Sequence, residues 1–137
     1  MLANGITLEM KRTGEDAFVA LTGLKEVPEL GVDPEKVDNT TLADKVKISE
    51  LGIGDPGDLA YKFKWENGSE NSTYRKLREV ADLKETAEFK ETFPDGTSFA
   101  FSAQVSLKVG GGGVNAAIEY TATMGLQSTI VVTDPVA

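Results

Sequence analysis

The acidic side chains are the groups in this sequence with the greatest potential for chemistry, because the 137 residues include neither histidine nor cysteine. Without imidazole or thiol groups, the chain cannot build a Ser-His-Asp triad, a cysteine nucleophile, a disulfide framework or the usual zinc and haem sites. Carboxylates alone can hydrolyse glycosides when two acids lie about 5 to 9.5 Å apart. No pair of acids stands out from the general surface charge, so we expect no enzyme activity, no cofactor and no metal.

Two glycine-containing motifs could in principle bind ions. Asp55 and Asp58 flank a Pro-Gly pair, but their spacing is not that of a calcium loop, and a plain turn is the better interpretation. Four consecutive glycines at residues 110–113 resemble a phosphate-binding loop, yet no Lys-Ser/Thr pair follows them. We therefore predict that these glycines form the tip of a hairpin.

The charge of the chain limits its partners. Twenty-two acidic residues against 14 basic ones give a formal charge of −8 at pH 7, which repels DNA backbones and anionic membrane surfaces. No stretch approaches the roughly 18 to 20 apolar residues of a transmembrane helix, and residues 1–15 lack the pattern of a signal peptide. We expect no membrane binding and no nucleic-acid binding through counterion release.

Most of the chain shows the two-residue period of β-strands. Leu59, Tyr61, Phe63 and Trp65 alternate with charged residues, and similar alternation follows over residues 85–93, 99–109 and 115–124. A Pro-Asp-Gly-Thr sequence at 94–97 predicts a hairpin between two of these strands. Apolar residues at helical spacing predict one amphipathic helix over residues 70–82, capped by Ser69, Asn71 or Ser72.

The elements combine into a single mainly β domain over residues 1–137. We predict an antiparallel β-sandwich or flattened barrel of about six or seven strands with one α-helix. Residues 1–15 are expected to form a flexible arm or a short first strand. Residues 29–50 are interrupted by glycine, proline and asparagine, and we interpret them as a long loop that ends in a short strand. Loops of this length are commonly functional.

The outward faces of the two long C-terminal strands share a polar, short-chained character with Lys108 as the main positive charge. Such a face gives a polyanion little to adhere to, although an ordinary solvent-facing sheet has the same composition. The candidate residues for a surface that lets a polyanion pass are Ser102, Gln104, Ser106, Lys108, Asn115, Glu119, Thr121 and Thr123.

Five segments in this order resemble the tail tube (major tail) protein of long, non-contractile phage tails. They are FVALTGLKEVP at 18–28, VDNTTLAD at 37–44, LGIGDPGDLAY at 51–61, YRKL at 74–77 and FPDGT at 93–97. The resemblance runs over most of the chain and implies a β-sandwich subunit with one helix. Such subunits assemble into stacked hexameric rings whose C-terminal strands form a continuous inner barrel. The type VI secretion tube protein is similar in fold.

The resemblance also implies roles for the segments described above. The polar candidates would line a weakly negative lumen that conveys DNA without binding it, and the long loop would reach the neighbouring subunit or ring. The candidate residues of that loop are Val37, Asp38, Asn39, Thr40, Thr41, Leu42 and Asp44. Expected partners are further copies of the chain, the tape-measure protein, tail chaperones and the tail terminator. The expected location is the virion tail, after synthesis in the host bacterial cytoplasm.

Other functions remain open from the sequence. A tail terminator or head–tail joining protein of the same fold would form one ring instead of a stack. A β-sandwich ligand-binding module would use Tyr61, Phe63, Trp65 or Tyr120 as a platform for a sugar, which requires at least one of these rings to be exposed. The alternation of the strands places all four on apolar faces.

Overall fold

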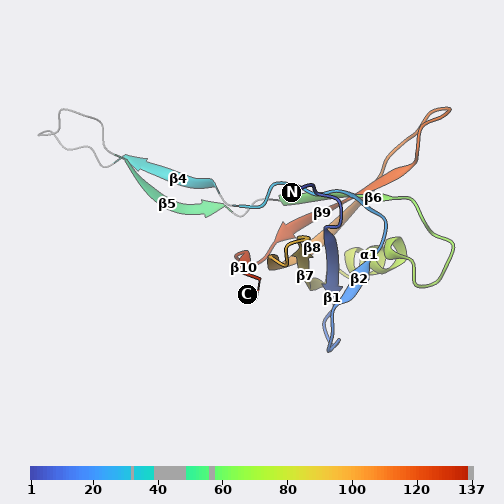
Figure 1. The fold of residues 1–137 in the computed structure, drawn as a ribbon, viewed down its shortest axis with the longest axis horizontal. Coiled ribbons are helices and arrows are strands. Elements are labelled where there is room, and N and C mark those ends of the chain that lie inside the picture. Colours follow the sequence, from blue (N-terminus) through green and yellow to red (C-terminus); the bar gives the residue numbers. More distant parts are fainter. Residues whose placement is uncertain (32, 39–48, 56–57, 136–137) are drawn as a thin grey trace, which may run out of the picture.

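The computed structural model describes the backbone of residues 1–31, 33–38, 49–55 and 58–135, and the side chains of residues 1–31 and 58–135. Most of the described strands belong to one antiparallel sheet with a single helix against it (Figure 1). The mainly β class with one helix, predicted from the sequence, is confirmed. The strands of this sheet are β1 (Thr7–Lys11), β2 (Val19–Leu21), β3 (Leu24–Glu26), β6 (Asp58–Lys64), β7 (Thr86–Thr92), β8 (Ser98–Val109), β9 (Glu119–Leu126) and β10 (Val131–Thr133).

The sheet is open but strongly curved. Its strand order is β2-β1-β7-β8-β9-β6-β3, with β10 paired to the first residues of β8. The two edge strands β2 and β3 are consecutive in the chain and are joined only by Thr22 and Gly23. A flat sheet of seven strands would hold its edges about 29 Å apart, whereas this link spans at most roughly 11 Å. The sheet must therefore curl around its core, which gives the flattened-barrel shape without closing the barrel.

Alternating residues of the sheet form the core. Strand β6 shows the pattern most clearly, since Leu59, Tyr61 and Phe63 are buried while the residues between them are exposed. The rings of Phe63 and Tyr120 stack at a centroid distance of 5.3 Å. The remaining core side chains come from every long strand and the helix; among them are Leu8, Met10, Leu77, Val80, Phe89, Phe101, Ala103, Ala122 and Met124.

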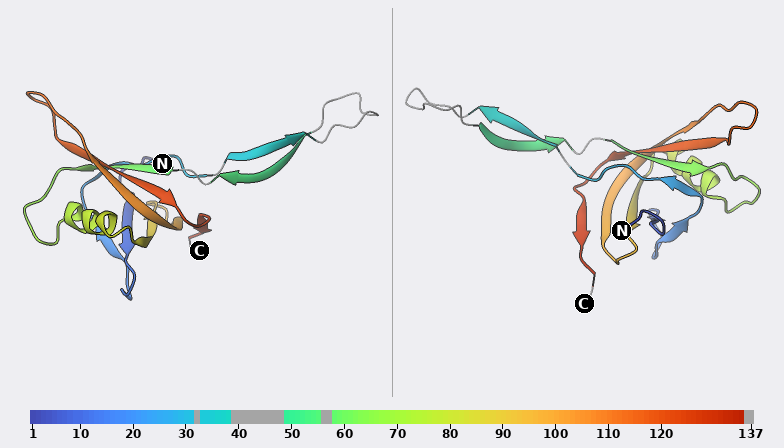
Figure 2. Two further views of the ribbon diagram at one scale, coloured as in Figure 1. Left: turned by 180° about the vertical axis from the view of Figure 1, so that it is seen from behind. Right: turned by 45° about the horizontal axis from the view of Figure 1, so that its top comes forward.

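Helix α1 (Thr73–Asp82) packs against β8 and covers the core on one side (Figure 2). The side-chain oxygen of Ser72 accepts a hydrogen bond from the backbone N–H of Arg75 and so caps the helix, as the sequence predicted. Thr73 ties the helix to the link between the sheet edges, because its hydroxyl accepts a hydrogen bond from the N–H of Thr22 at 2.8 Å. Within the described residues, no helix has the length and apolarity needed to cross a membrane.

The N-terminal segment belongs to the sheet. A flexible arm over residues 1–15 was one of two expectations, and the structure contradicts it for β1, which lies between β2 and β7. Leu8 and Met10 are buried there and pair with strand residues on both sides. The strand has only two core residues, so its alternation is too short to stand out from the polar residues around it.

The long loop expected over residues 29–50 is contradicted in part by a second, two-stranded sheet. Strands β4 (Asp33–Asp38) and β5 (Ser49–Asp55) pair antiparallel, with Val37 opposite Glu50 and an irregularity between Pro34 and Lys36. In Figure 1 this hairpin projects from the body. Each strand of a two-stranded sheet has one free edge, and such an edge tolerates a proline that lacks the N–H donor. Residues 39–48 lie outside the described part of the chain.

Candidate functional site

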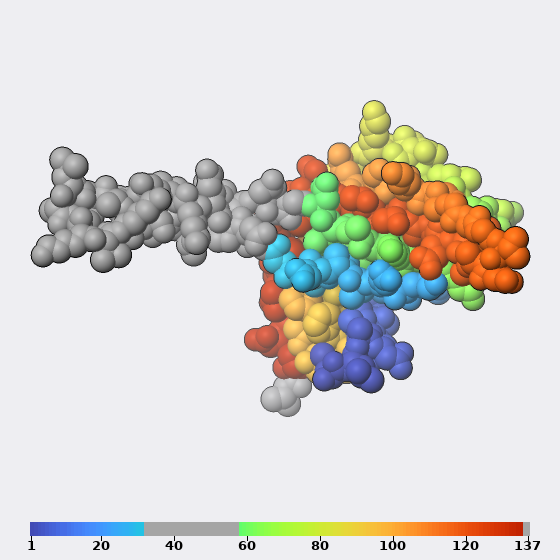
Figure 3. Space-filling view, turned by 90° about the horizontal axis from the view of Figure 1, so that it is seen from above, coloured from blue at the N-terminus to red at the C-terminus, as the bar shows by residue number. Residues whose placement is uncertain are grey.

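The side of the sheet opposite the core carries a continuous polar surface on β6, β9 and β8. In the middle of it, Thr121 lies opposite Lys62 on one side and Lys108 on the other, while Thr123 lies between Ala60 and Ser106. Residues directly opposite one another in antiparallel strands point to the same face. We call this surface the polar face; its residues are Asp58, Ala60, Lys62, Lys64, Ser102, Gln104, Ser106, Lys108, Glu119, Thr121, Thr123 and Gly125. Figure 3 shows β3, β6 and β9 side by side across the body.

Seven of the eight polar candidates from the sequence share this face. Asn115 does not, because it lies in the exposed connection between β8 and β9, with a left-handed φ of 69°. Strand β9 begins only at Glu119, so the alternation predicted from residue 115 starts four residues later than expected. Ser102 and Gln104 lie toward the other end of the face. There the backbone N–H of Ser102 donates a hydrogen bond to the Ser128 hydroxyl, and its backbone carbonyl accepts one from the N–H of Gln127.

The polar face carries more positive charge than the sequence suggested. Strand β6 adds Lys62 and Lys64. The alternation of this strand predicts that both lysines face solvent, but it does not show that they share a surface with β8 and β9. The signal was present in the alternation of β6. What the sequence did not contain was the pairing of β6 with β9, which is set by contacts between residues far apart in the chain.

Ion pairs balance most of these charges. Lys62 lies 3.6 Å from the carboxylate of Glu26, and Lys64 lies 3.2 Å from that of Glu66. Lys25 donates a hydrogen bond to Glu119, which holds the pKa of that carboxyl group below its usual value. Among the described residues, Lys108 has no ion pair. The expectation of a face with Lys108 as its main positive charge is therefore corrected: acids and lysines on and around this face are close to equal in number.

Two stretches of strand near the polar face lack a neighbour on one side. Pairing between β7 and β8 ends at Gln104, whereas β9 continues beside β8 as far as Val109. Residues 105–109 therefore have a strand partner only on the β9 side within the described part of the chain. Strand β3 pairs with β6 only at Phe63 and Lys62, so residues 58–61 are similarly open. Unpaired strand edges are sites where another strand can add.

Three of the four aromatic residues considered as a sugar platform lie inside the protein, and the fourth, Trp65, is partly buried. Tyr61, Phe63 and Tyr120 are buried, and Trp65 packs against the rings of Tyr74 and Tyr120. A sugar platform needs an exposed ring face, so these residues do not support the ligand-binding hypothesis. Their burial also raises the pKa of the Tyr61 and Tyr120 hydroxyls.

One buried acid was not recognised from the sequence. Glu91 faces the core from β7 and has no exposed surface, and neither of its carboxylate oxygens has a hydrogen-bond partner of good geometry among the described residues. The Tyr61 hydroxyl is likewise without such a partner. Burial raises the pKa of Glu91 above its usual value, and the nearby Tyr61 hydroxyl opposes part of this rise although its geometry is too poor for a hydrogen bond. The alternation of β7 predicted an inward position for this residue, but gave no reason for a carboxylate to lie there.

A single curved sheet presents a charge-balanced polar face, open strand edges and a projecting hairpin, which are features of a subunit that assembles with other chains. The model of the phage tail tube protein (TTP) family matches residues 7–134, and the chain belongs to this family. The resemblance inferred from the sequence is thereby confirmed.

Comparison with solved structures supports the same fold. The chain is similar to a protein in the tail of an empty GTA particle determined with C6 symmetry, with 20% identity, coverage of 96% of this chain and 99% of that one, and a TM-score of 0.74. It is also similar to the SPP1 tail tube protein, with 8% identity, coverage of 100% and 81%, and a TM-score of 0.66. A type six secretion system protein matches with 12% identity, coverage of 93% and 83%, and a TM-score of 0.51. A search of curated proteins found no match.

Proposed function

We propose that this chain is a structural subunit of a phage tail tube, and that its copies form stacked hexameric rings around a lumen that conveys the genome. The observation that carries the proposal is the polar face, a broad sheet surface with paired charges that continues to open strand edges. Membership of the tail tube family and a fold shared with a tail of C6 symmetry support it. In this role the chain has no catalytic residues and no cofactor.

The charges of the polar face suit a wall along which DNA slides. The affinity of a protein for DNA grows with the number of phosphates that its cations neutralise. Lys25, Lys62 and Lys64 each have a carboxylate partner, which leaves Lys108 as the cation of the face without an ion pair in the described part of the chain. We therefore propose a nearly neutral lumen wall in place of the weakly negative one expected from the sequence, because a neutral wall would convey DNA without holding it.

The open strand edges of β8 and β6 allow neighbouring subunits to join into a ring. We expect residues 105–109 of β8 in one subunit to pair with the open edge at residues 58–61 of β6 in the next. Repeated around the ring, this pairing would join the strands into one inner barrel and remove the exposed edges. This contact is heterologous, because it uses different surfaces on the two subunits. Copies joined in this way form a closed ring only when the rotation between neighbours adds up to a full turn.

The β4–β5 hairpin is the element that we expect to reach a neighbouring subunit or ring. Val37 and Asp38 lie in β4, opposite Glu50 and Ser49, whereas the other loop candidates lie outside the described residues. The proposed location is the virion tail, with synthesis in the host cytoplasm. The proposed further partners are the tape-measure protein, tail chaperones and the tail terminator.

Electron microscopy of the purified protein tests the proposal. We expect rings that stack into hollow tubes, alone or after addition of the tape-measure protein and chaperones. A protein that stays monomeric under all of these conditions would refute the proposal, and single rings that never stack would favour a terminator or joining protein of the same fold.

A deletion of residues 38–44 tests the role of the hairpin. We expect the circular dichroism spectrum to keep the signal of the main sheet, because the core formed by the described side chains belongs to the strands of that sheet and to α1. Tube growth should be lost. Normal tubes from the deletion variant would show that the hairpin does not connect subunits or rings.

A further inference from the structure

The connection between β8 and β9 carries apolar side chains into solvent. All residues from 108 to 118 are exposed, and Val109, Val114 and Ile118 expose 48%, 95% and 50% of their surface. Figures 1 and 2 show this hairpin tip (residues 109–118) extending away from the body. Single exposed apolar residues are common on protein surfaces, but three on one projecting tip indicate a contact site.

The hairpin tip is also uncharged in a strongly acidic chain. Residues 109–118 contain no Asp, Glu, Lys or Arg, although the chain as a whole carries a formal charge of −8. Two copies with this charge repel each other. A contact between copies is therefore favoured where both surfaces are locally neutral and apolar, and the hairpin tip meets both conditions.

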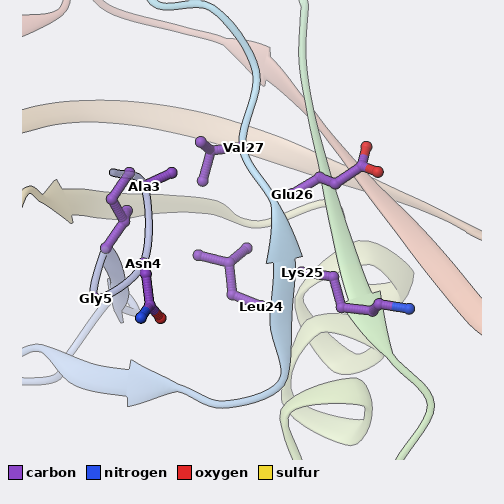
Figure 4. A pocket seen from close by; sticks show the side chains of 8 residues that line it. Ala3, Asn4, Gly5, Leu24, Lys25, Glu26 and Val27 are labelled. Atoms are coloured by element: carbon purple, nitrogen blue, oxygen red, sulfur yellow. The ribbon is translucent and has the colours of Figure 1, made fainter. Parts of the chain in front are cut away.

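A hollow on the same chain has matching properties. It has a volume of about 500 Å³ and lies between residues 3–6 and residues 24–27. Ala3, Leu24 and Val27 point toward one another across it, whereas Lys25 and Glu26 point away (Figure 4). Those two charged side chains pair with Glu119 and Lys62 on the polar face. The interior of this N-terminal hollow is thus uncharged: apolar side chains lie beside the polar side chain of Asn4, and the two charged lining residues are engaged elsewhere.

We propose that the hairpin tip of one subunit packs into the N-terminal hollow of a neighbouring subunit. The proposal rests on the function proposed above. It names a second copy of this chain as the occupant because the tip is uncharged and apolar, and the hollow is uncharged and offers the apolar side chains of Ala3, Leu24 and Val27, within an otherwise repulsive molecule. The contact joins two different surfaces, so it propagates from copy to copy as ring or tube assembly requires. It buries Val114 and Ile118, which are the tip residues with the most to gain from leaving water.

Cross-linking tests the contact directly, because the chain has no native cysteine. Two variants, Val114→Cys and Ala3→Cys, are mixed, assembled into tubes and treated with a short bismaleimide. We expect linked dimers that contain one copy of each variant. The matched control replaces Ala3→Cys with Ala17→Cys, which is also an exposed alanine near the N-terminus. Tubes that give no linked dimer, or as much with Ala17→Cys, would overturn the contact and leave the tail tube function intact.

A double variant provides an independent measurement. Val114→Ser combined with Ile118→Ser should raise the lowest protein concentration that supports tube growth by about tenfold or more, since burial of each aliphatic side chain is favourable. Ala117→Ser, on the same tip, should leave that concentration unchanged. Unaltered growth of the double variant would refute the contact. A wild-type protein that forms no rings would refute both the proposed function and the contact that depends on it.

Discussion

Replacing Glu91 with methionine should make the protein more stable at neutral pH. The carboxylate of Glu91 is fully buried, between Leu8 of β1 and Phe99 of β8 in the sheet register, and neither oxygen has a partner of good geometry in the described part of the chain. Methionine has a similar unbranched shape and no charge, and its flexibility lets it fill the same space. The change therefore removes two of the three buried oxygens that lack a partner in the described residues, leaves the Tyr61 hydroxyl as it is, and largely keeps the packing.

The magnitude follows from the cost of burying an unpaired polar group. That cost is about 1–3 kcal/mol, and it is larger for a charged group. The entropy of unfolding is roughly 2.1 cal/mol/K per residue near 60 °C, so 1 kcal/mol corresponds to about 3.5 °C in a chain of 137 residues. We expect Glu91→Met to raise the free energy of unfolding by about 1–3 kcal/mol and Tm by about 4–10 °C.

The effect should grow with pH. Because burial raises the pKa of Glu91 in the folded state, this group contributes its full stability below the ordinary pKa of a glutamate. That contribution is lost as the pH rises through the raised folded-state pKa. The variant has no such group. The difference in free energy of unfolding between the variant and the wild type should therefore be smallest in acid and largest at neutral and alkaline pH. The other carboxylates are present in both proteins, so their effects cancel in this difference.

Thermal and urea unfolding at pH 4, 6 and 8 would measure this difference. Glu88→Met is the matched control, since Glu88 lies on the same strand but points to solvent and pairs with Lys11; exposed pairs contribute at most about 1 kcal/mol. A Glu91→Met protein that is less stable than the wild type at pH 8 would refute the reasoning, because it would show that the carboxylate is paired in solution.

Three further perturbations test other parts of the structure. Ser72→Ala removes the cap of α1 and should lower the free energy of unfolding by about 1 kcal/mol in urea titrations. Gly96→Ala should lower it by about 1–2 kcal/mol in the same assay, because Gly96 has a φ of +98° and an added Cβ would lie 3.1 Å from the Cβ of Pro135. Thr121→Lys with Thr123→Lys adds two cations to the polar face and should give salt-dependent binding of DNA, measured by fluorescence anisotropy.

Each of these variants has a control in the same chain. Ser69→Ala removes a hydroxyl just before the helix that does not cap it, and Gly111→Ala places a Cβ in open space; both should leave stability nearly unchanged. Thr13→Lys adds a cation outside the polar face. Equal losses in the first two controls, or equal DNA binding by tubes that carry Thr13→Lys, would contradict the structural explanation in each case.

The sequence predicted those parts of the fold that depend on local patterns. The alternation from Leu59 to Phe63, the cap at Ser72 and the turn that contains Gly96 are each set by residues close together in the chain, and all three are observed. The pairing of strands is set by distant contacts. For this reason the sequence did not place Lys62 beside Thr121, and did not show that the strands form one open sheet.

The same distinction explains what was missed in the candidate site. Seven polar candidates share a face because the period of β8 and β9 is visible in the sequence, whereas Asn115 was misplaced because the exact start of β9 depends on its pairing with β6. The burial of Glu91 depends on β1, which lies much earlier in the chain, as well as on its hairpin partner β8. The β4–β5 pairing is hidden by Pro34 and by the glycines at 52 and 54.

The two edge strands of the sheet are neighbours in the sequence, and this arrangement affects how the chain folds. Strand β2 pairs with β1, which precedes it, but β1 pairs with β7 and β3 pairs with β6, so both edges of the sheet are attached to it only through strands that are synthesised later. Sheets dominated by such long-range pairings fold in milliseconds to seconds, more slowly than helical proteins. We therefore expect a newly made chain to pair its interior strands first, and the link at Thr22 and Gly23 to reach its final position last.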